Sequence, residues 1–220
     1  MIPLSLAEIE QLAPGNLERA AWATEVTGMQ VDSRRIAEGD LFVAVGSGAD
    51  FVKHAFARGA AATLVPDNAF AALAALGGAV RDRSSARVVG ITGSMGKTST
   101  KDLLTALCAP AARTIAAEAS FNNEIGVPLT LCRLEPDTEV CILELSMRGF
   151  GQIAELCEFT RPHIGAITNI APVHLEKVET LDGVVRAKSE LIAALPPDGT
   201  AIVPAGFPVG RDDIVVVRVG

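Results

Sequence analysis

The segment from residue 88 to residue 107 constrains the fold of this chain more than any other. Apolar residues at 88–92 predict a buried strand, small residues at 93–96 predict a tight loop, and residues 97–107 have the composition of a helix with one apolar face. In a strand–loop–helix unit of this kind, backbone N–H groups converge on an anion and the helix N-terminus adds positive potential. The segment therefore predicts a phosphate-binding site.

The loop has the pattern G-x-x-G-K-T from Gly93 to Thr98, and Ile91 stands where the usual P-loop has its first glycine. In that pattern the lysine reaches the outer phosphates of a nucleotide and the next hydroxyl ligates Mg²⁺, which are the roles predicted for Lys97 and Thr98. The alternative is a glycine turn before an ordinary helix, but the flanking strand and helix favour nucleotide binding. The predicted ATP-binding residues are Gly93, Ser94, Met95, Gly96, Lys97, Thr98 and Ser99.

Composition and charge exclude several classes of protein. The chain has 220 residues, of which 49% are hydrophobic and only 4% aromatic, so we expect alanine, valine and leucine to fill the core. The net charge of −7 disfavours non-specific binding to nucleic acid. The four cysteines are scattered through apolar segments without a C-x-x-C pair, which indicates buried free thiols in a reducing cytoplasm. We find no signal-peptide pattern and no apolar run of about 18 residues, so we expect a cytoplasmic protein without a membrane span.

The first 84 residues predict a small α/β domain. Ser5 and Glu8 have the spacing of a capping box, which indicates a short first helix. Gly77 and Gly78 are expected to end the last helix of this domain, and the polar residues 81–87 to form a linker. The further strands and helices expected here lie at 41–45, 52–58, 61–65 and 69–76.

Residues 85–220 predict a P-loop-type, doubly wound parallel sheet, because strand and helix signals alternate along them. Ligands of such sheets bind at the carboxyl ends of the strands. The expected strands lie at 88–92, 113–116, 140–145, 164–168, 201–203 and 214–219. The expected helices lie at 97–107, 152–159 and 181–195, with a further helix starting near 127.

Five polar residues in this second domain are candidates for chemistry. Glu144 lies at the end of an apolar run, where a carboxylate without a partner is costly and where a P-loop fold places a metal-bound carboxylate. The alternative for Glu144 is a surface residue at a strand end. Taken alone, His174 predicts a structural histidine, Lys188 a solvated lysine, and Asn122 with Asn123 a capped loop. Their joint occurrence is the informative signal.

The joint pattern resembles the Mur ligases, the ATP-dependent amide-forming enzymes of peptidoglycan synthesis. Residues 90–98 are similar to the family's nucleotide loop, and residues 168–176 and 186–188 to its metal and lysine motifs. The segment 122–130 is most similar to the branch that adds D-alanyl-D-alanine to a UDP-N-acetylmuramoyl tripeptide. Similarity to that branch's N-terminal, UDP-binding domain is found at 32–34, 39–44 and 57–60.

The sequence departs from the family pattern in two respects. The loop at 45–51 is shorter than the Asp-Gly-His loop of the family, and Ala49 stands where the histidine would be. Family members also continue past the position of Gly220. The resemblance therefore implies an N-terminal portion, with a UDP-substrate domain at 1–84 and the first part of the central ATP-binding domain at 85–220, and no C-terminal domain. We expect this portion alone to be inactive as a ligase.

The resemblance also implies a mechanism and its residues. ATP would activate the tripeptide carboxylate as an acyl phosphate, which the amine of D-alanyl-D-alanine then attacks. Lys188 would be carbamylated by CO₂, which turns an ammonium into an oxygen ligand. The implied catalytic residues are Lys97, Glu144, His174 and Lys188, and the implied Mg²⁺ ligands are Thr98, Glu144, His174 and Lys188. The implied substrate-binding residues are Ser33 and Arg34 at the UDP end, and Asn122 and Asn123 at the peptidyl side.

Two other functions stay open at this point. One is a related ligase with another acceptor, such as a folylpolyglutamate synthase or another Mur enzyme, against which the segment 122–128 argues. The other is a nucleotide-binding module without catalysis that acts through a partner.

Overall fold

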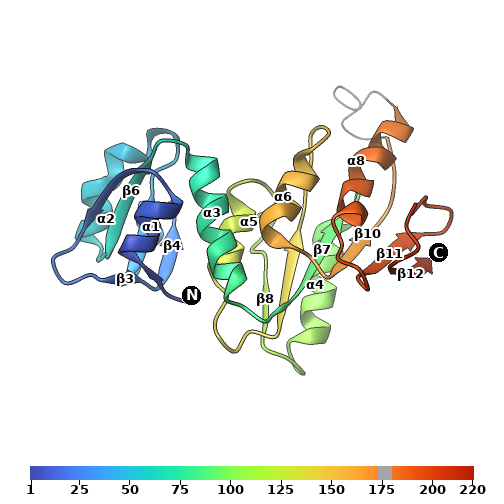
Figure 1. Cartoon of the computed structure of the whole chain (residues 1–220), viewed down its shortest axis with the longest axis horizontal. Coiled ribbons are helices and arrows are strands. Elements are labelled where there is room, and N and C mark those ends of the chain that lie inside the picture. Colours follow the sequence, from blue (N-terminus) through green and yellow to red (C-terminus); the bar gives the residue numbers. More distant parts are fainter. Residues whose placement is uncertain (173–179) are drawn as a thin grey trace. The chain divides into compact units, whose positions relative to one another are not determined.

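The chain divides into two units, and no single cut in the sequence separates them. In the computed structural model, which describes residues 1–172 and 180–220, unit 1 comprises Met1–Ser84 together with Leu131–Pro136. Unit 2 comprises Ser85–Thr130 and Asp137–Gly220 (Figure 1). In unit 1 the backbone N–H of Ile2 donates to the carbonyl of Leu134 at 2.7 Å, and Leu134 is wholly buried. Unit 1 is thus completed by a short stretch that lies far along the sequence.

The strands of unit 1 form a small ribbon and a mixed sheet. The ribbon pairs β1 with β3, and the four-stranded sheet has the order β2-β6-β5-β4. In that sheet β4, β5 and β6 are parallel, whereas β2 is antiparallel to β6. The bounds are β1 Leu4–Ser5, β2 Gly15–Arg19, β3 Glu25–Val26, β4 Gly28–Gln30, β5 Asp40–Val43 and β6 Ala62–Pro66. The sequence did not predict β1 to β4, because they are short and β2 buries none of its residues.

The core of unit 1 lies on both faces of its sheet. Phe42 of β5 packs with Ala44, Ala55 and Ala60 on one face, and Leu41 and Val43 are buried on the other. The helices are α1 Leu6–Leu12, α2 Val52–Ala57 and α3 Ala69–Asp82, with 3₁₀ turns η1 Ser33–Arg35 and η2 Gly46–Phe51. The predicted capping box is confirmed, because Ser5 Oγ accepts from Glu8 N and Glu8 Oε2 accepts from Ser5 N.

The predicted end of α3 was wrong, because the helix continues through Gly77 and Gly78 to Asp82. Leu73, Leu76 and Val80 are wholly buried along it, and packing of this kind overrides the low helix propensity of glycine. The predicted linker is also too long. Arg81 and Asp82 are helical and Arg87 begins the next strand, so only residues 83–86 connect the two elements.

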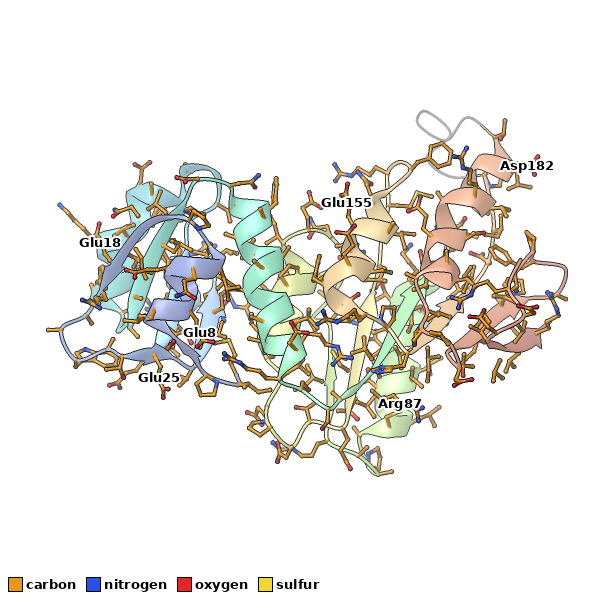
Figure 2. The ribbon with its side chains drawn as sticks, in the orientation of Figure 1. Glu8, Glu18, Glu25, Arg87, Glu155 and Asp182 are labelled. Carbon is orange, nitrogen blue, oxygen red and sulfur yellow. The ribbon has the colours of Figure 1, made fainter. Side chains whose placement is uncertain are left out.

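Unit 2 is built on a six-stranded sheet, in which every described neighbouring pair is parallel. Its order is β12-β11-β10-β7-β9-β8, so β7 is central, and Figure 2 labels Arg87, where β7 begins. The predicted α/β class with a parallel sheet is confirmed. The strands are β7 Arg87–Thr92, β8 Thr114–Ala116, β9 Val140–Glu144, β10 Ile164–Ile167, β11 Thr200–Pro204 and β12 Val215–Val219. The described helices are α4 Lys97–Cys108, α5 Gly126–Leu131, α6 Gln152–Thr160 and α8 Leu181–Ala193.

Helices cover both faces of this sheet. Val89 and Ile91 of β7 pack with Leu104 of α4 on one face. Gly90 points to the other face, where a Cβ atom would lie 3.0 Å from Leu191 Cδ1 of α8. The sheet is therefore doubly wound, and the carboxyl ends of β7, β9 and β10 meet at one edge, as the alternation of strands and helices predicts.

Three of the four cysteines are buried free thiols, as predicted, and Cys108 is only partly buried. Burial raises the pKa of the Cys132 and Cys157 thiols to about 12, so both are protonated and unreactive at neutral pH. Among the residues that the structure describes, no helix has the length and apolar character needed to cross a membrane.

The packing of α3 makes a prediction about the stability of unit 1. Leu76→Ala should lower the free energy of unfolding by about 2–5 kcal/mol, because Leu76 is wholly buried and its truncation leaves a cavity. Urea unfolding followed by the fluorescence of Trp22, the single tryptophan, measures this effect. Phe70→Ala on the same helix is the control, since Phe70 is 48% exposed and should change stability by less than about 1 kcal/mol. Equal effects of the two variants would contradict the described packing.

Candidate active site

The phosphate loop joins the central strand β7 to helix α4. Gly93 has φ +151°, and a Cβ atom there would lie 1.9 Å from Thr168 Oγ1, so the loop tolerates only glycine at this point. Lys97 is the first residue of α4, with Thr98 and the exposed Ser99 after it. The loop and the helix N-terminus thus have the arrangement that the sequence predicted for an anion site.

A second segment, residues 168–171 after β10, holds the phosphate loop in place. Met95 N donates to Asn169 Oδ1 at 2.8 Å, and Ser94 N donates to Asn169 O at 3.1 Å. Thr168 Oγ1 donates to Met95 O at 2.6 Å. Ser94 Oγ donates to Ala171 O at 2.9 Å. These contacts hold the backbone of the phosphate loop, and they explain why polar residues follow this strand.

Glu144 is the central polar group of the site. Its side chain is 1% exposed at the end of β9, yet both carboxylate oxygens have donors. Thr98 Oγ1 donates to Oε2 at 2.8 Å, and Asn122 Nδ2 donates to Oε1 at 2.7 Å. The alternative interpretation of the sequence, in which Glu144 is a surface residue, is therefore wrong. The carboxylate stays buried because it lies next to the phosphate-binding helix and accepts two hydrogen bonds.

The oxygen atoms of Thr98 and Glu144 form a donor set that fits Mg²⁺. Magnesium prefers oxygen ligands and is usually held by one or two carboxylates together with water and substrate phosphates. Within residues 1–172 and 180–220, no group of three or more His, Cys, Asp or Glu side chains is placed to hold a metal ion. A single carboxylate with a hydroxyl beside a phosphate loop suits an ion that arrives with a nucleotide.

Two lysines carry positive charge into this region. Lys97 Nζ folds back and donates to Gly93 O at 2.9 Å, so it lies over the loop that would hold phosphates. Lys188 of α8 is only 3% exposed, and burial, together with the positive charge of Lys97, lowers its pKa to about 8. Among the described residues, none makes a hydrogen bond or ion pair with the Lys188 ammonium. The sequence alternative of a solvated lysine is wrong, because α8 packs its Lys188 face against the unit.

The two neighbouring asparagines have different surroundings. Asn122 contacts Glu144, and its Oδ1 and backbone oxygen both accept from Ser146 Oγ at 2.9 Å. Asn123 Oδ1 instead accepts from Gly126 N at 3.0 Å and from Ile125 N at 3.3 Å, which caps the start of α5. A substrate contact for either residue stays a prediction. His174 lies outside the described residues.

Ser33 and Arg34 border a cavity of about 700 Å³ in unit 1. Ser33 is buried, and its Oγ shares a hydrogen bond of 2.9 Å with His54 Nδ1. Arg34 pairs with Asp32 at 2.7 Å, and its hydrogen bonds lower the pKa of that carboxyl to about 2. The cavity is lined by Val31, Asp32, Ser33, Arg34, Phe42, Val45, Ser47, Gly48, Phe51 and His54.

Three of these features were not predicted from the sequence. The short loop at 45–51 lines the cavity despite its missing histidine, and His54 of the following helix supplies an imidazole there instead. Asn169 holds the phosphate loop, although the resemblance assigned its motif to metal binding. A histidine in a small domain could have been suspected of binding a ligand. Its hydrogen bond with Ser33, however, depends on how α2 packs on η1.

Residues 91–214, more than half of the chain, match the sequence profile of the Mur ligase middle domain. The chain belongs to the Mur ligase family. The UDP-N-acetylmuramoyl-tripeptide--D-alanyl-D-alanine ligase of Escherichia coli K12 is 35% identical over 93% of this chain and 48% of the relative. The enzyme of the same name from Bacillus subtilis 168 is 32% identical over 92% of this chain and 49% of its own length. The chain thus spans about half the length of the curated relatives that it matches.

Solved structures agree with this family assignment. A crystal structure of MurF from Acinetobacter baumannii superposes with a TM-score of 0.86 at 28% identity, over 99% of this chain and 53% of that one. The MurF ligase of Thermotoga maritima in complex with ADP gives a TM-score of 0.75 at 27% identity, over 87% of this chain and 49% of that one. Escherichia coli FolC, at 16% identity and a TM-score of 0.52, shares the fold alone.

The burial of Lys188 makes a prediction about pH. The pKa is lowered from 10.5 to about 8, so the folded chain holds this proton less tightly than the unfolded chain. The charged Lys188 therefore lowers the free energy of unfolding by its full amount below about pH 8. This loss of stability disappears as the pH rises towards 10.5. Lys188→Met should raise the melting temperature at pH 7 in CO₂-free buffer, and the gain should shrink between pH 8 and pH 10.5.

Thermal unfolding followed by circular dichroism measures this difference. Lys53→Met is the control, because Lys53 is exposed and its replacement should give no gain that depends on pH in this way. A melting temperature of Lys188→Met equal to or below that of the wild type at pH 7 would show that the lysine is not held against its charge.

Proposed function

We propose that this chain is part of an ATP-dependent ligase that adds D-alanyl-D-alanine to a UDP-N-acetylmuramoyl tripeptide. The observation that carries the proposal is the buried Glu144 beside Thr98, at the mouth of a phosphate loop on a doubly wound sheet. This arrangement supports phosphoryl transfer from a nucleotide. The relatives named above support the identity of the two substrates, since their names state this ligation.

The reaction has two displacement steps. A carboxylate oxygen of the tripeptide attacks the γ-phosphorus of ATP, a new O–P bond forms, and the bond to ADP breaks. The amine of D-alanyl-D-alanine then attacks the acyl carbon, the bond to phosphate breaks, and the amine loses a proton as the amide forms. Both the attacking carboxylate and the triphosphate are anions, so the site must supply positive charge where they meet.

The residues of unit 2 would supply this charge and the alignment. Lys97, which lies over the loop carbonyls, would turn to the outer phosphates once an anion occupies the loop. Thr98 and Glu144 would hold Mg²⁺, which, when bound, neutralises charge on the phosphate oxygens. The backbone of Gly93 to Gly96, clamped by Thr168 and Asn169, would fix the phosphates without having to reorganise during the reaction.

Lys188 would become a metal ligand by carbamylation. The ammonium first loses a proton, and the neutral amine then attacks CO₂, so that an N–C bond forms and a second proton is released. The two steps together turn a positive group into a negative one. The change of about two charge units favours cations and relieves the repulsion by Lys97. Burial of Lys188 supports this chemistry, because it favours the neutral amine that reacts with CO₂. With His174, the resulting carbamate would hold a second Mg²⁺.

Unit 1 would bind the UDP end of the substrate. The cavity bordered by Ser33 and Arg34 combines apolar walls, from Phe42 and Phe51, with an imidazole and a guanidinium at its rim. Such a cavity suits a ring with a charged tail. We propose residues 1–84 as the UDP-substrate domain and residues 85–220 as the first part of the ATP-binding domain.

The ATP site is tested by Lys97→Ala in the complete ligase that carries this chain. Phosphate release should require ATP, UDP-tripeptide and D-alanyl-D-alanine together, and the variant should reduce its rate by at least about a hundredfold, because a cation at the transferred phosphoryl group is lost. Lys53→Ala, at an exposed lysine of unit 1, should bind ATP as the wild type does. Phosphate release that follows glutamate and a folate instead of D-alanyl-D-alanine would overturn the proposed substrates.

The carbamate is tested by Lys188→Ala in the same ligase. The variant should lose most of its activity, and acetate should restore part of it by supplying a carboxylate at the vacated place. Acetate should not restore the activity of Lys188→Arg, since the arginine places a positive charge where a negative ligand is needed. With ¹³C-labelled bicarbonate, the wild type should show a carbamate carbon signal by NMR that both variants lack. Turnover by Lys188→Ala at the wild-type rate without acetate would rule out the metal role.

A further inference from the structure

Lys101 is a buried charged residue that the proposed reaction does not use. Its side chain is 3% exposed in the second turn of α4, where lysines are rarely buried. The ammonium donates to Ala117 O and Ala119 O, each at 2.9 Å, and pairs with Asp102 Oδ1 at 2.9 Å. All three N–H donors of the ammonium are therefore occupied. Two of them hold backbone carbonyls of a single segment.

That segment, residues 117–121, leads from β8 towards Asn122. Ala119 has φ +46°, a left-handed conformation that is unfavourable for residues other than glycine. The segment is also packed closely at its end, since a Cβ atom on Gly126 would lie 2.6 Å from Phe121 Cα. The two carbonyl contacts of Lys101 thus hold a strained turn in one conformation.

The position of Asn122 depends on this turn. Asn122 is one residue beyond the segment, and its Nδ2 donates to Glu144 Oε1 at 2.7 Å. The other oxygen of Glu144 accepts from Thr98, which lies three residues before Lys101 and on the same side of α4. Helix α4 therefore acts on both oxygens of Glu144. Thr98 contacts one oxygen directly, and Lys101 acts on the other through the turn that carries Asn122.

We propose that Lys101 is a positioning residue, which sets the contact of Asn122 with Glu144 and thereby the affinity of the site for its divalent cation. Lys101 is not one of the residues proposed to hold the nucleotide or the metal. The inference rests on the proposed function in one respect, namely that Thr98 and Glu144 hold the cation. A lysine that only satisfied two carbonyls would affect stability but not metal binding.

Lys101→Met tests the proposal, because methionine keeps an apolar stem and removes the three donors. The probe is Mn²⁺ in the presence of ADP, with free Mn²⁺ followed by electron paramagnetic resonance in the complete ligase. We expect the Mn²⁺ Kd to rise about tenfold, at the low end of the effect of groups that orient metal ligands. Asp102→Asn is the matched control. It keeps both carbonyl contacts, and since Asp102 is exposed it should change the Kd by less than about twofold.

A double-mutant cycle separates this role from a structural one. Asn122→Ala should raise the Kd as Lys101→Met does, and Lys101→Met should have no further effect in the Asn122→Ala background, because both act through one contact. Effects that multiply, or a lowered melting temperature with an unchanged Kd, overturn the proposal. Lys101→Gln keeps an amide donor, so its Mn²⁺ Kd must lie between those of the wild type and Asn122→Ala. This variant tests the proposal if Lys101→Met does not fold. Failure of the wild type itself to bind Mn²⁺ with ADP would instead contradict the metal site of the proposed function.

Discussion

The buried carboxylate of Glu144 is the constraint on which the rest of unit 2 depends. A charge at the end of a central strand is tolerated only where donors reach both of its oxygens, and here they come from the phosphate-binding helix and from the segment before α5. These hydrogen bonds bring together β9, α4 and the segment before α5. Thr98 of the phosphate-binding helix and Asn122 are neighbours because both donate to this carboxylate.

The side chains of Glu144, Lys101 and Lys188 are buried charged groups of unit 2, and they find hydrogen-bond or ion-pair partners to different degrees. Glu144 has two neutral donors, and Lys101 has two carbonyls and a carboxylate. Lys188 has no such partner among the described residues, and its pKa falls accordingly. The first two arrangements hold the site in one geometry. The third leaves an amine whose charge is easily removed, which is a property of reactive rather than structural lysines.

The sequence predicted those features that depend on neighbours along the chain. The strand, glycine loop and helix at 88–107 are specified by local periodicity, and the capping box at Ser5 by a spacing of three residues. Features decided by tertiary packing were missed or wrong. Gly77 and Gly78 stay helical because Leu76 before them and Val80 after them are buried. The burial of Lys101 and Lys188 depends on which helix face meets the sheet. The contact of Asn169 with Met95 joins residues 74 positions apart, which no local pattern could reveal.

The detour of Leu131–Pro136 into unit 1 has a consequence for how the protein is made. Unit 1 acquires Leu134, and with it the partner of Ile2, only after the chain has been synthesised beyond α4, β8 and α5. The ribosome has therefore released the whole phosphate-binding motif before the N-terminal unit can close its core. Unit 1 therefore completes its fold only after much of unit 2 has been synthesised, unlike successive domains, each of which folds as its own segment emerges. A fragment that ends at Ser84 would therefore lack Leu134, which is wholly buried in unit 1.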